Sequence, residues 1–156
     1  MGSTERIKNV AKRVAKWARA GHQMVVVPSA MSGETNRLLG LAKELSLSSP
    51  GDTHSRELDA LAATGEQASS ALLAIALQAE GMASVSYAGW QVAIKTNSAH
   101  TKARIESIDD KKVRADLDAG QVVIITGFQG VDSAGNITTL GRGGSDTSAV
   151  DRKSVV

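Results

Sequence analysis

The sequence predicts an α/β domain with a mostly parallel β-sheet that helices cover on both faces. Two runs rich in β-branched residues, 24–27 and 122–126, suit strands that are buried on both sides. Segments with apolar residues at helical spacing alternate with these runs. Such alternation is typical of parallel sheets with helical crossovers. Aromatic residues form only 3% of the chain, so we expect a core of aliphatic side chains.

Composition limits the classes of protein to which the chain can belong. Its 156 residues suit one domain, and its net charge of +2 is too small to indicate nucleic-acid binding. The lack of cysteine excludes disulfides, thiolate zinc sites and cysteine nucleophiles. No apolar run approaches the roughly 18 residues that cross a bilayer. We therefore expect no membrane span and a cytoplasmic location.

The first part of the chain predicts a helix, a strand and a second helix. Residues 4–20 have the spacing of an amphipathic helix that Gly21 ends. Residues 24–27 predict a buried strand, which Pro28 ends because proline cannot donate to a ladder. Residues 29–36 then form a strand-to-helix turn. The apolar face of the second helix is expected to comprise Leu38, Leu39, Leu41, Ala42 and Leu45.

After a loop at 46–53, the middle of the chain predicts two helices, residues 54–61 and 65–78, with a break near Thr64 and Gly65. The second of them is expected to be well buried, because apolar residues make up most of it. They include Ala68, Ala71, Leu72, Ala74, Ile75 and Leu77.

Shorter patterns predict the remaining elements. Residues 83–87 and 103–108 indicate strands, whereas residues 91–102 indicate no element. Residues 109–119 predict a polar helix. The strand at 122–126 stops at Gly127 and is followed by a variable loop. Asp109 and Asp110 are interpreted as charges at the start of that helix, and no metal site is predicted.

A glycine-rich segment follows, with Gly141, Gly143 and Gly144 around Arg142. Glycine lets the backbone approach a ligand closely. A helix capped by Ser145 or Asp146 would present free N–H groups to an anion. Composition alone leaves a second reading open, in which this is a glycine-rich turn with a surface arginine. Since ligands of parallel sheets bind beyond the carboxyl ends of strands, residues 29–36 and 128–146 are expected to line one crevice.

Three segments resemble the aspartokinase family. They are residues 25–39 (VVVPSAMSGETNRLL), residues 62–67 (AATGEQ), and residues 127–130 (GFQG) followed by 137–149 (ITTLGRGGSDTSA). The resemblance covers roughly residues 3–150, in the order and spacing of the family. It implies the amino acid kinase fold, a three-layer α/β/α sandwich that would be incomplete here. It also implies ATP-dependent phosphorylation of the side-chain carboxylate of L-aspartate, with Mg²⁺, as the entry to lysine, threonine and methionine synthesis.

The resemblance assigns roles to individual residues. Arg142 is similar to the arginine that grips the aspartate carboxylate, and Ser145 and Asp146 would line the same pocket. Glu66 matches the glutamate that receives the ammonium group of the substrate. A free amino acid needs one cation and one anion, which Arg142 and Glu66 would supply from opposite sides of a cleft.

Further matches are Thr35 in the substrate-binding turn, Phe128 over the pocket and Ser29 on the phosphate side. If the resemblance to the family is set aside, Glu66 is interpreted as a carboxylate at a helix start that complements the helix dipole. Thr35 is then interpreted as a first-turn residue without a binding role. The histidines lie outside the three segments and are expected at the surface. They are His22, His54 and His100.

The chain also departs from the family pattern. Aspartokinases open with a strand and loop of the type Lys-Phe-Gly-Gly-Thr-Ser, whose lysine steadies the transferring phosphoryl group, whereas this sequence opens with Met1-Gly2-Ser3. At the other end, residues 151–156 leave the family pattern. We therefore expect residues 1–150 to be the substrate-binding half of a catalytic domain, weak or inactive alone, with no catalytic residue of its own. A homo-oligomer is expected. Alternatives are a self-associating or ligand-binding module, or a kinase of another carboxylate such as acetylglutamate, although Glu66 disfavours an acetylated amine.

Overall fold

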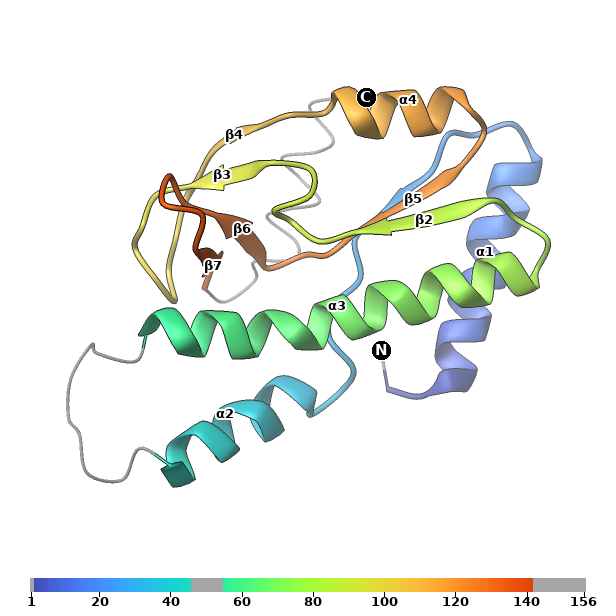
Figure 1. Cartoon of the computed structure of the whole chain (residues 1–156). Coiled ribbons are helices and arrows are strands. Elements are labelled where there is room, and N and C mark those ends of the chain that lie inside the picture. The colour runs from blue at the N-terminus through green and yellow to red at the C-terminus, as the bar shows by residue number, and fades with distance from the viewer. Residues whose placement is uncertain (1, 46–54, 142–156) are drawn as a thin grey trace.

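The computed structural model describes residues 2–45 and 55–141 as an α/β fold in three layers (Figure 1). In chain order the elements are α1 (Thr4–Arg19), β1 (Val25–Val26), α2 (Glu34–Leu45), α3 (Ser55–Ala79), β2 (Ser84–Tyr87), β3 (Ile94–Thr96), β4 (Ile105–Ile108), α4 (Lys111–Asp118), β5 (Val122–Ile125), β6 (Gln129–Val131) and β7 (Ile137–Thr139).

The centre of the fold is a parallel sheet in the order β1-β5-β2. Val25 pairs with Val123 on one side of β5, and Val85 pairs with Val123 on the other. All four residues of β5 are buried, as the run of β-branched side chains predicts. The predicted buried parallel strand at the end of the chain is therefore confirmed.

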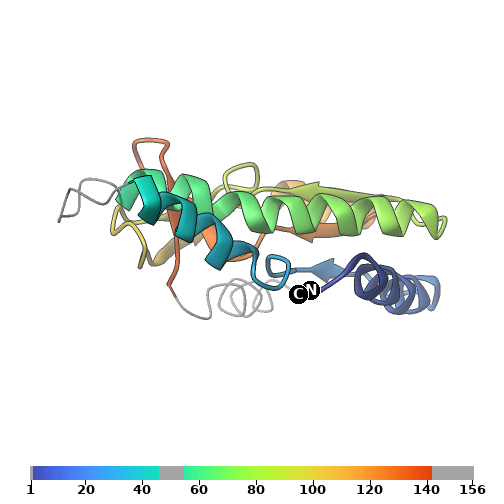
Figure 2. The ribbon, with the colours of Figure 1, turned by 90° about the horizontal axis from the view of Figure 1, so that it is seen from below.

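Helices cover both faces of this sheet. Val122 and Ile124 pack into one apolar cluster with residues of α1 and α3, whereas Val123 and Ile125 pack into a second cluster with Val113 of α4. This division follows from the alternation of side chains along a strand. Figures 1 and 2 show α1 and α3 on one side of the strands and α4 on the other. The predicted α/β/α layering is confirmed.

A second sheet, with the order β4-β3-β6-β7, departs from the prediction. Its β3–β4 and β6–β7 pairs are antiparallel, and only β3 and β6 run parallel. The sequence indicated no element where β3 lies and a loop where β6 lies. Both strands are three residues long, too short for a clear alternation pattern. Strands β3 and β6 pair with each other although they lie far apart in the sequence, and local patterns do not reveal such a contact.

Helix α3 is continuous, so the predicted break near Thr64 is wrong. Glycine inside a helix costs only about 1 kcal/mol, which tertiary packing overrides here. Thr64 Oγ1 donates to the carbonyl of Leu61 at 2.7 Å and so has a partner within the helix. Gly65 is buried and faces the turn after β1: a Cβ added to it would lie 3.1 Å from the Cβ of Ala30. The glycine therefore serves close packing of the turn on the helix.

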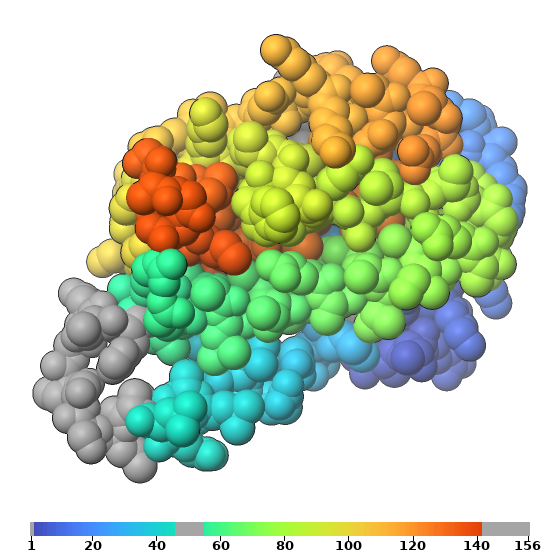
Figure 3. Space-filling view, in the orientation of Figure 1, coloured from blue at the N-terminus to red at the C-terminus, as the bar shows by residue number. Residues whose placement is uncertain are grey.

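Only one side of α3 is buried, so the expectation that its second part is well buried is only partly correct. Leu73 and Leu77 are fully enclosed, but Ile75 remains 61% exposed and Leu72 37%. Figure 3 shows α3 lying open across one face of the molecule. By length and composition the helix would pass as a membrane span, but half of its apolar stretch is buried in the fold. We interpret it as the core helix of the domain.

The apolar face predicted for α2 is also largely wrong. Leu38 alone among the five residues proposed for it is buried, and Leu39, Leu41 and Leu45 are exposed. Helix α2 packs against α3 through this narrow contact (Figure 2). By contrast, the predicted helix at 4–20 is confirmed, with Ser3 Oγ accepting a hydrogen bond from the Arg6 amide at 3.2 Å.

Gly130 offers a test of the second sheet. A Cβ at this position would lie 2.5 Å from Thr96 Cγ2 and 2.6 Å from the carbonyl oxygen of Ile94. Because the backbone of β3 cannot retreat, we expect Gly130→Ala to lower the free energy of unfolding by about 2–4 kcal/mol, measured by urea denaturation. Gly40→Ala is the control: nothing lies within 4 Å of its added Cβ in α2. It should be neutral or stabilise by up to about 1 kcal/mol. Equal stabilities for the two variants would contradict the close approach.

Candidate functional site

The turn that follows β1 forms one wall of an open cavity of about 230 Å³. Its lining consists of residues 29–33, Thr35, Asn36 and the side chain of Glu66 from α3. Helix α2 begins inside this turn, at Glu34, and its residues Thr35 and Asn36 line the cavity. The cavity thus lies beyond the carboxyl end of a parallel strand, where ligands of such sheets bind.

Glu66 is the buried charge of this cavity. It is only 4% exposed and lies in the interior of α3, so the interpretation as a carboxylate at a helix start is wrong. Burial raises the pKa of the Glu66 carboxyl, and the backbone amides of Glu66 and Ala30 offset only part of that rise. Among the described residues Oε2 has no hydrogen-bond partner. A cationic group in the cavity would replace the stabilisation by water that this carboxylate loses on burial.

Further buried polar atoms lie close to Glu66 in the chain or beyond the strand ends. Ser69 Oγ, Ser70 Oγ and Thr126 Oγ1 are buried and have no partner within residues 2–45 and 55–141. Ser69 and Ser70 follow Glu66 by one helical turn, and Thr126 directly follows β5. Unsatisfied buried groups are rare in folded proteins and mark places where a further partner is expected.

Phe128 adopts a strained backbone conformation. Its φ of +69° lies in the left-handed region, which bulky residues rarely enter. The carbonyl of Phe128 accepts a hydrogen bond from the Leu140 amide at 2.9 Å, which ties the residue to the end of β7. Phe128 is half-buried and is not among the residues that line the cavity. Strain of this kind concentrates at functional sites.

The structure brings together some of the residues that the resemblance singled out. Ser29, Thr35 and Glu66 share one cavity, with Ser29 exposed and Thr35 half-buried. Arg142, together with Ser145 and Asp146, lies outside the described residues. The arrangement in which Arg142 faces Glu66 therefore stays a prediction. So does the crevice between 29–36 and 128–146, of which the structure shows the first wall.

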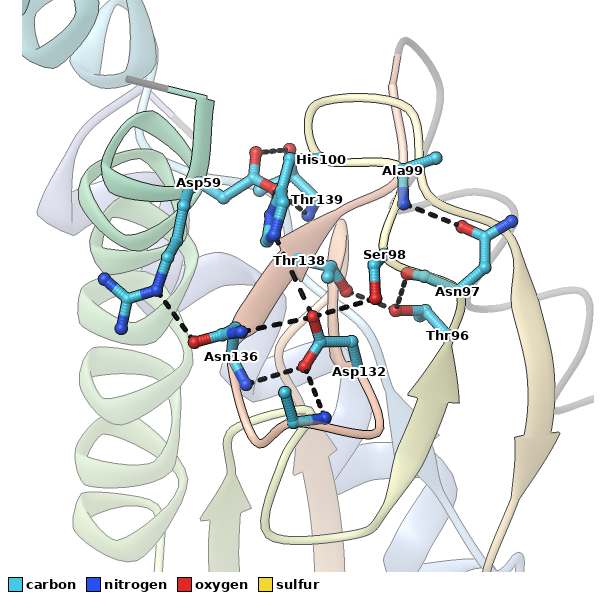
Figure 4. A network of polar contacts seen from close by, with 12 residues as sticks. Asp59, Thr96, Asn97, Ser98, Ala99, His100, Asp132, Asn136, Thr138 and Thr139 are labelled. Carbon is cyan, nitrogen blue, oxygen red and sulfur yellow. Dashed lines mark hydrogen bonds and ion pairs between the residues drawn. The ribbon is translucent and has the colours of Figure 1, made fainter. Parts of the chain in front are cut away.

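A polar network around Asp59, His100 and Asp132 was not foreseen (Figure 4). His100 was expected at the surface, but its side chain is only 15% exposed and its Nδ1 lies 2.8 Å from Asp59 Oδ2. Burial would raise the pKa of Asp132, but hydrogen bonds led by those from Asn136 outweigh it and lower that pKa. His22 is exposed, as predicted, and His54 lies outside the described residues.

The described residues do not form a metal-binding site. Within 2–45 and 55–141, no group of three or more His, Asp or Glu side chains is placed to hold a metal ion. Asp109 instead accepts a hydrogen bond from the Lys111 amide at 3.1 Å, at the start of α4 as the sequence predicts. A divalent cation that accompanies a nucleotide would thus need ligands beyond these described groups.

Comparison with known proteins decides the family. The model of the amino acid kinase family matches residues 1–152. The chain belongs to the amino acid kinase family. This agrees with the three-layer fold and with a site beyond the carboxyl ends of parallel strands.

Individual relatives narrow the comparison. The chain is 60% identical over 152 residues to an aspartate kinase of Pseudomonas fluorescens, and the match covers 96% of this chain but 36% of the relative. An aspartokinase of Pseudomonas aeruginosa is 59% identical over 150 residues, with 96% and 35% covered. The chain therefore spans about a third of the length of these relatives.

Solved structures support the same fold. The aspartate kinase of Synechocystis superposes with a TM-score of 0.75 at 40% identity, covering 96% of this chain and 24% of the other. The aspartokinase III of E. coli, solved in complex with aspartate and ADP, gives a TM-score of 0.73 at 22% identity, covering 94% of this chain and 44% of the other. The latter likeness bears on the fold alone.

The state of Glu66 yields a pH-dependent prediction. Because burial raises its pKa above the ordinary value of 4.5, its neutral form favours folding in acid, and this contribution is lost as the pH rises through the raised pKa. Glu66→Gln removes the buried charge. We expect it to raise the melting temperature near neutral pH by about 2–4 °C, the shift that about 1 kcal/mol produces in a domain of this size. The gain should vanish in acid.

Circular dichroism melts at a series of pH values measure this difference. Glu106→Gln, which changes an exposed glutamate of β4 in the same way, should show no such growth with pH. An offset between Glu66→Gln and the wild type that stays constant at all pH values would contradict the account.

Proposed function

We propose that this chain binds L-aspartate for an aspartate kinase, which transfers the γ-phosphoryl group of ATP to the side-chain carboxylate of the amino acid. The observation that carries the proposal is the buried carboxylate of Glu66 at an open cavity beyond a strand end, with one oxygen unpaired among the described residues. An ammonium group is the partner that such a carboxylate accepts best. The relatives, at 56–60% identity, carry the name aspartate kinase or aspartokinase.

The other residues have proposed roles around that anchor. Thr35, at the start of α2, would contact the bound amino acid, and Ser29 would lie toward the phosphates. Arg142 would bind a carboxylate of aspartate with its planar guanidinium, and Ser145 and Asp146 would complete that end of the pocket. Phe128 would cover the pocket. Holding both ends of the amino acid orients its free carboxylate toward the nucleotide.

The reaction itself forms one bond and breaks another. A side-chain carboxylate oxygen of aspartate bonds to the γ-phosphorus of ATP, while the bond from that phosphorus to the β,γ-bridging oxygen breaks, which yields aspartyl phosphate and ADP. Phosphoryl transfer depends on positioning and charge stabilisation. The residues of this chain would contribute the positioning of the acceptor. Mg²⁺ would accompany the ATP phosphates, and the use of ATP fits the cytoplasmic location that we propose.

Calorimetry with the purified chain tests the binding step without nucleotide. We expect L-aspartate to bind and N-acetyl-L-aspartate, whose amine is neutral, to bind at least about tenfold more weakly, since a charge-assisted hydrogen bond is lost. Glu66→Gln should weaken aspartate binding by a similar factor. Glu57→Gln, an exposed carboxylate on the same helix, is the matched control and should leave the affinity unchanged. Equal affinity for the two ligands would refute the role of Glu66.

We also propose that the protein forms homo-oligomers. Leu41 and Leu45 on α2 and Ile75 on α3 are exposed apolar side chains, and β1 pairs only with β5 among the described strands. Exposed apolar surface and an open strand edge both favour association. Light scattering over a range of concentrations should show a mass above that of one chain. A single chain mass at every concentration would contradict this.

A further inference from the structure

Gly65 lies in the interior of α3, directly before Glu66, where a helix gains nothing from glycine. Glycine is less favourable than alanine in a helix, because it loses more backbone freedom on folding. Gly65 is nevertheless buried, and a Cβ added to it would lie 3.1 Å from the Cβ of Ala30. Carbon atoms in contact are ordinarily about 3.5–4.0 Å apart. The missing side chain therefore lets the turn after β1 approach α3 more closely than alanine would permit (Figure 2).

The other neighbours of Gly65 do not require a glycine. After Ala30, the nearest atoms to the added Cβ are Glu34 Cγ at 3.7 Å and Leu38 Cδ1 at 3.9 Å, and both distances are ordinary contacts. Glu34 and Leu38 belong to α2, which follows the turn. The constraint thus falls on the turn at Ala30 and not on α2.

This close approach brings a backbone donor to the buried carboxylate of the cavity. Burial raises the pKa of Glu66, and hydrogen bonds from its own amide and from the Ala30 amide oppose that rise. Both Ala30 and Glu66 line the cavity. Glu66 Oε2 has no hydrogen-bond partner among the described residues. The turn therefore supports the carboxylate while one of its oxygens stays unpaired.

We propose that Gly65 is a positioning residue for the ammonium group of the ligand: it lets the turn after β1 lie so close to α3 that the Ala30 amide holds the Glu66 carboxylate, with Oε2 left for the ammonium group. A carboxylate that a backbone donor already holds has less freedom to lose when a ligand binds. Gly65 is not among the residues that line the cavity, so it acts through Ala30. The inference rests on the proposed function, in which Glu66 binds the amino group of aspartate.

Few other charges bear on Glu66 in the described part of the chain. Residues 29–33 carry no ionisable side chain, and neither do β1, β5 and β7. Helix α2 places Glu34 nearby, but its carboxylate accepts hydrogen bonds from the Arg37 guanidinium at 2.8 and 2.9 Å. On α3, Asp59 lies about two turns away and is hydrogen-bonded, and the ionisable residues of α1 are exposed. The titration of Glu66 therefore reports on its burial and on the Ala30 amide.

Carbon-13 NMR of the Glu66 carboxyl over a range of pH tests the positioning without any ligand. Gly65→Ala should push the turn away and weaken the Ala30 hydrogen bond, so the pKa of Glu66 should rise above its wild-type value. Ala30→Gly removes the atom that the new Cβ would meet, so the double variant should regain the wild-type titration. Gly40→Ala, the same change in open space on α2, is the control. A change that merely loosened the fold would expose the carboxyl and bring its pKa toward 4.5.

Calorimetry with L-aspartate measures the consequence for binding. Gly65→Ala should weaken binding about three- to tenfold, because the carboxylate must then be ordered when the ligand enters. In the Ala30→Gly background the same change should weaken binding less than about twofold. Gly40→Ala should bind as the wild-type chain does. Circular dichroism melts establish that each compared variant is folded; if Gly65→Ala is not, Ala30→Val, which crowds the same contact from the turn, replaces it with the same expected directions.

These outcomes separate the positioning role from the proposed function. An unchanged or lowered pKa of Glu66 in Gly65→Ala would overturn the positioning role. So would an unchanged affinity for aspartate, or an equal loss of affinity in both backgrounds. If the wild-type chain does not bind aspartate, the proposed function fails, and the titrations still decide whether Gly65 sets the Ala30 hydrogen bond.

Discussion

Two carboxylates buried in one helix, in opposite states, are the constraint on which this structure depends. Removing a carboxylate from water is costly unless hydrogen bonds or a positive charge replace the lost hydration. Asp59 is supplied with donors from the loop before β4 and from β7, and so it holds the fold together. Glu66, about two turns further on, keeps one oxygen without a partner among the described residues. The first carboxylate is satisfied by the protein itself, whereas the second keeps one oxygen available for the ligand that we propose.

Helix α3 gives these two sites a common frame. Its start is joined to the hairpin, its middle touches the turn after β1 at Gly65, and its last turns pack on β5. Gln129 adds another link, because its buried amide donates to the Ala63 carbonyl at 3.0 Å. Groups carried by a rigid element keep their relative positions better than groups on separate loops. This accounts for a helix of 25 residues along one face of the sheet in so small a domain.

Local patterns in the sequence predicted the layers well and the connections poorly. The β-branched strand β5 and the amphipathic α1 follow from side-chain periodicity alone. Asp59 and Glu66 also leave a sequence signal, since both occupy positions at which the spacing of buried residues in α3 calls for an apolar side chain. Their partners leave none: Thr101 and Thr139 lie 42 and 80 residues from Asp59. Strand β6 also pairs with the distant β3, and Gly65 in the middle of α3 packs against Ala30 in the turn after β1. Such contacts leave no local pattern in the sequence.

The unsatisfied side-chain atoms of Glu66, Ser69 and Ser70 on α3 indicate how the proposed function would constrain stability. A glutamine at this position would relieve the buried charge, and hydrophobic residues at Ser69 and Ser70 would fill the same space without leaving hydroxyls unpaired. Folding alone would therefore favour other residues. That, within the described residues, Glu66 keeps an unpaired oxygen at the cavity, while Asp59 is hydrogen-bonded through both oxygens, agrees with the binding site that we propose. A bound ammonium group, with several donors, would recover there the free energy that the unpaired oxygen costs in folding.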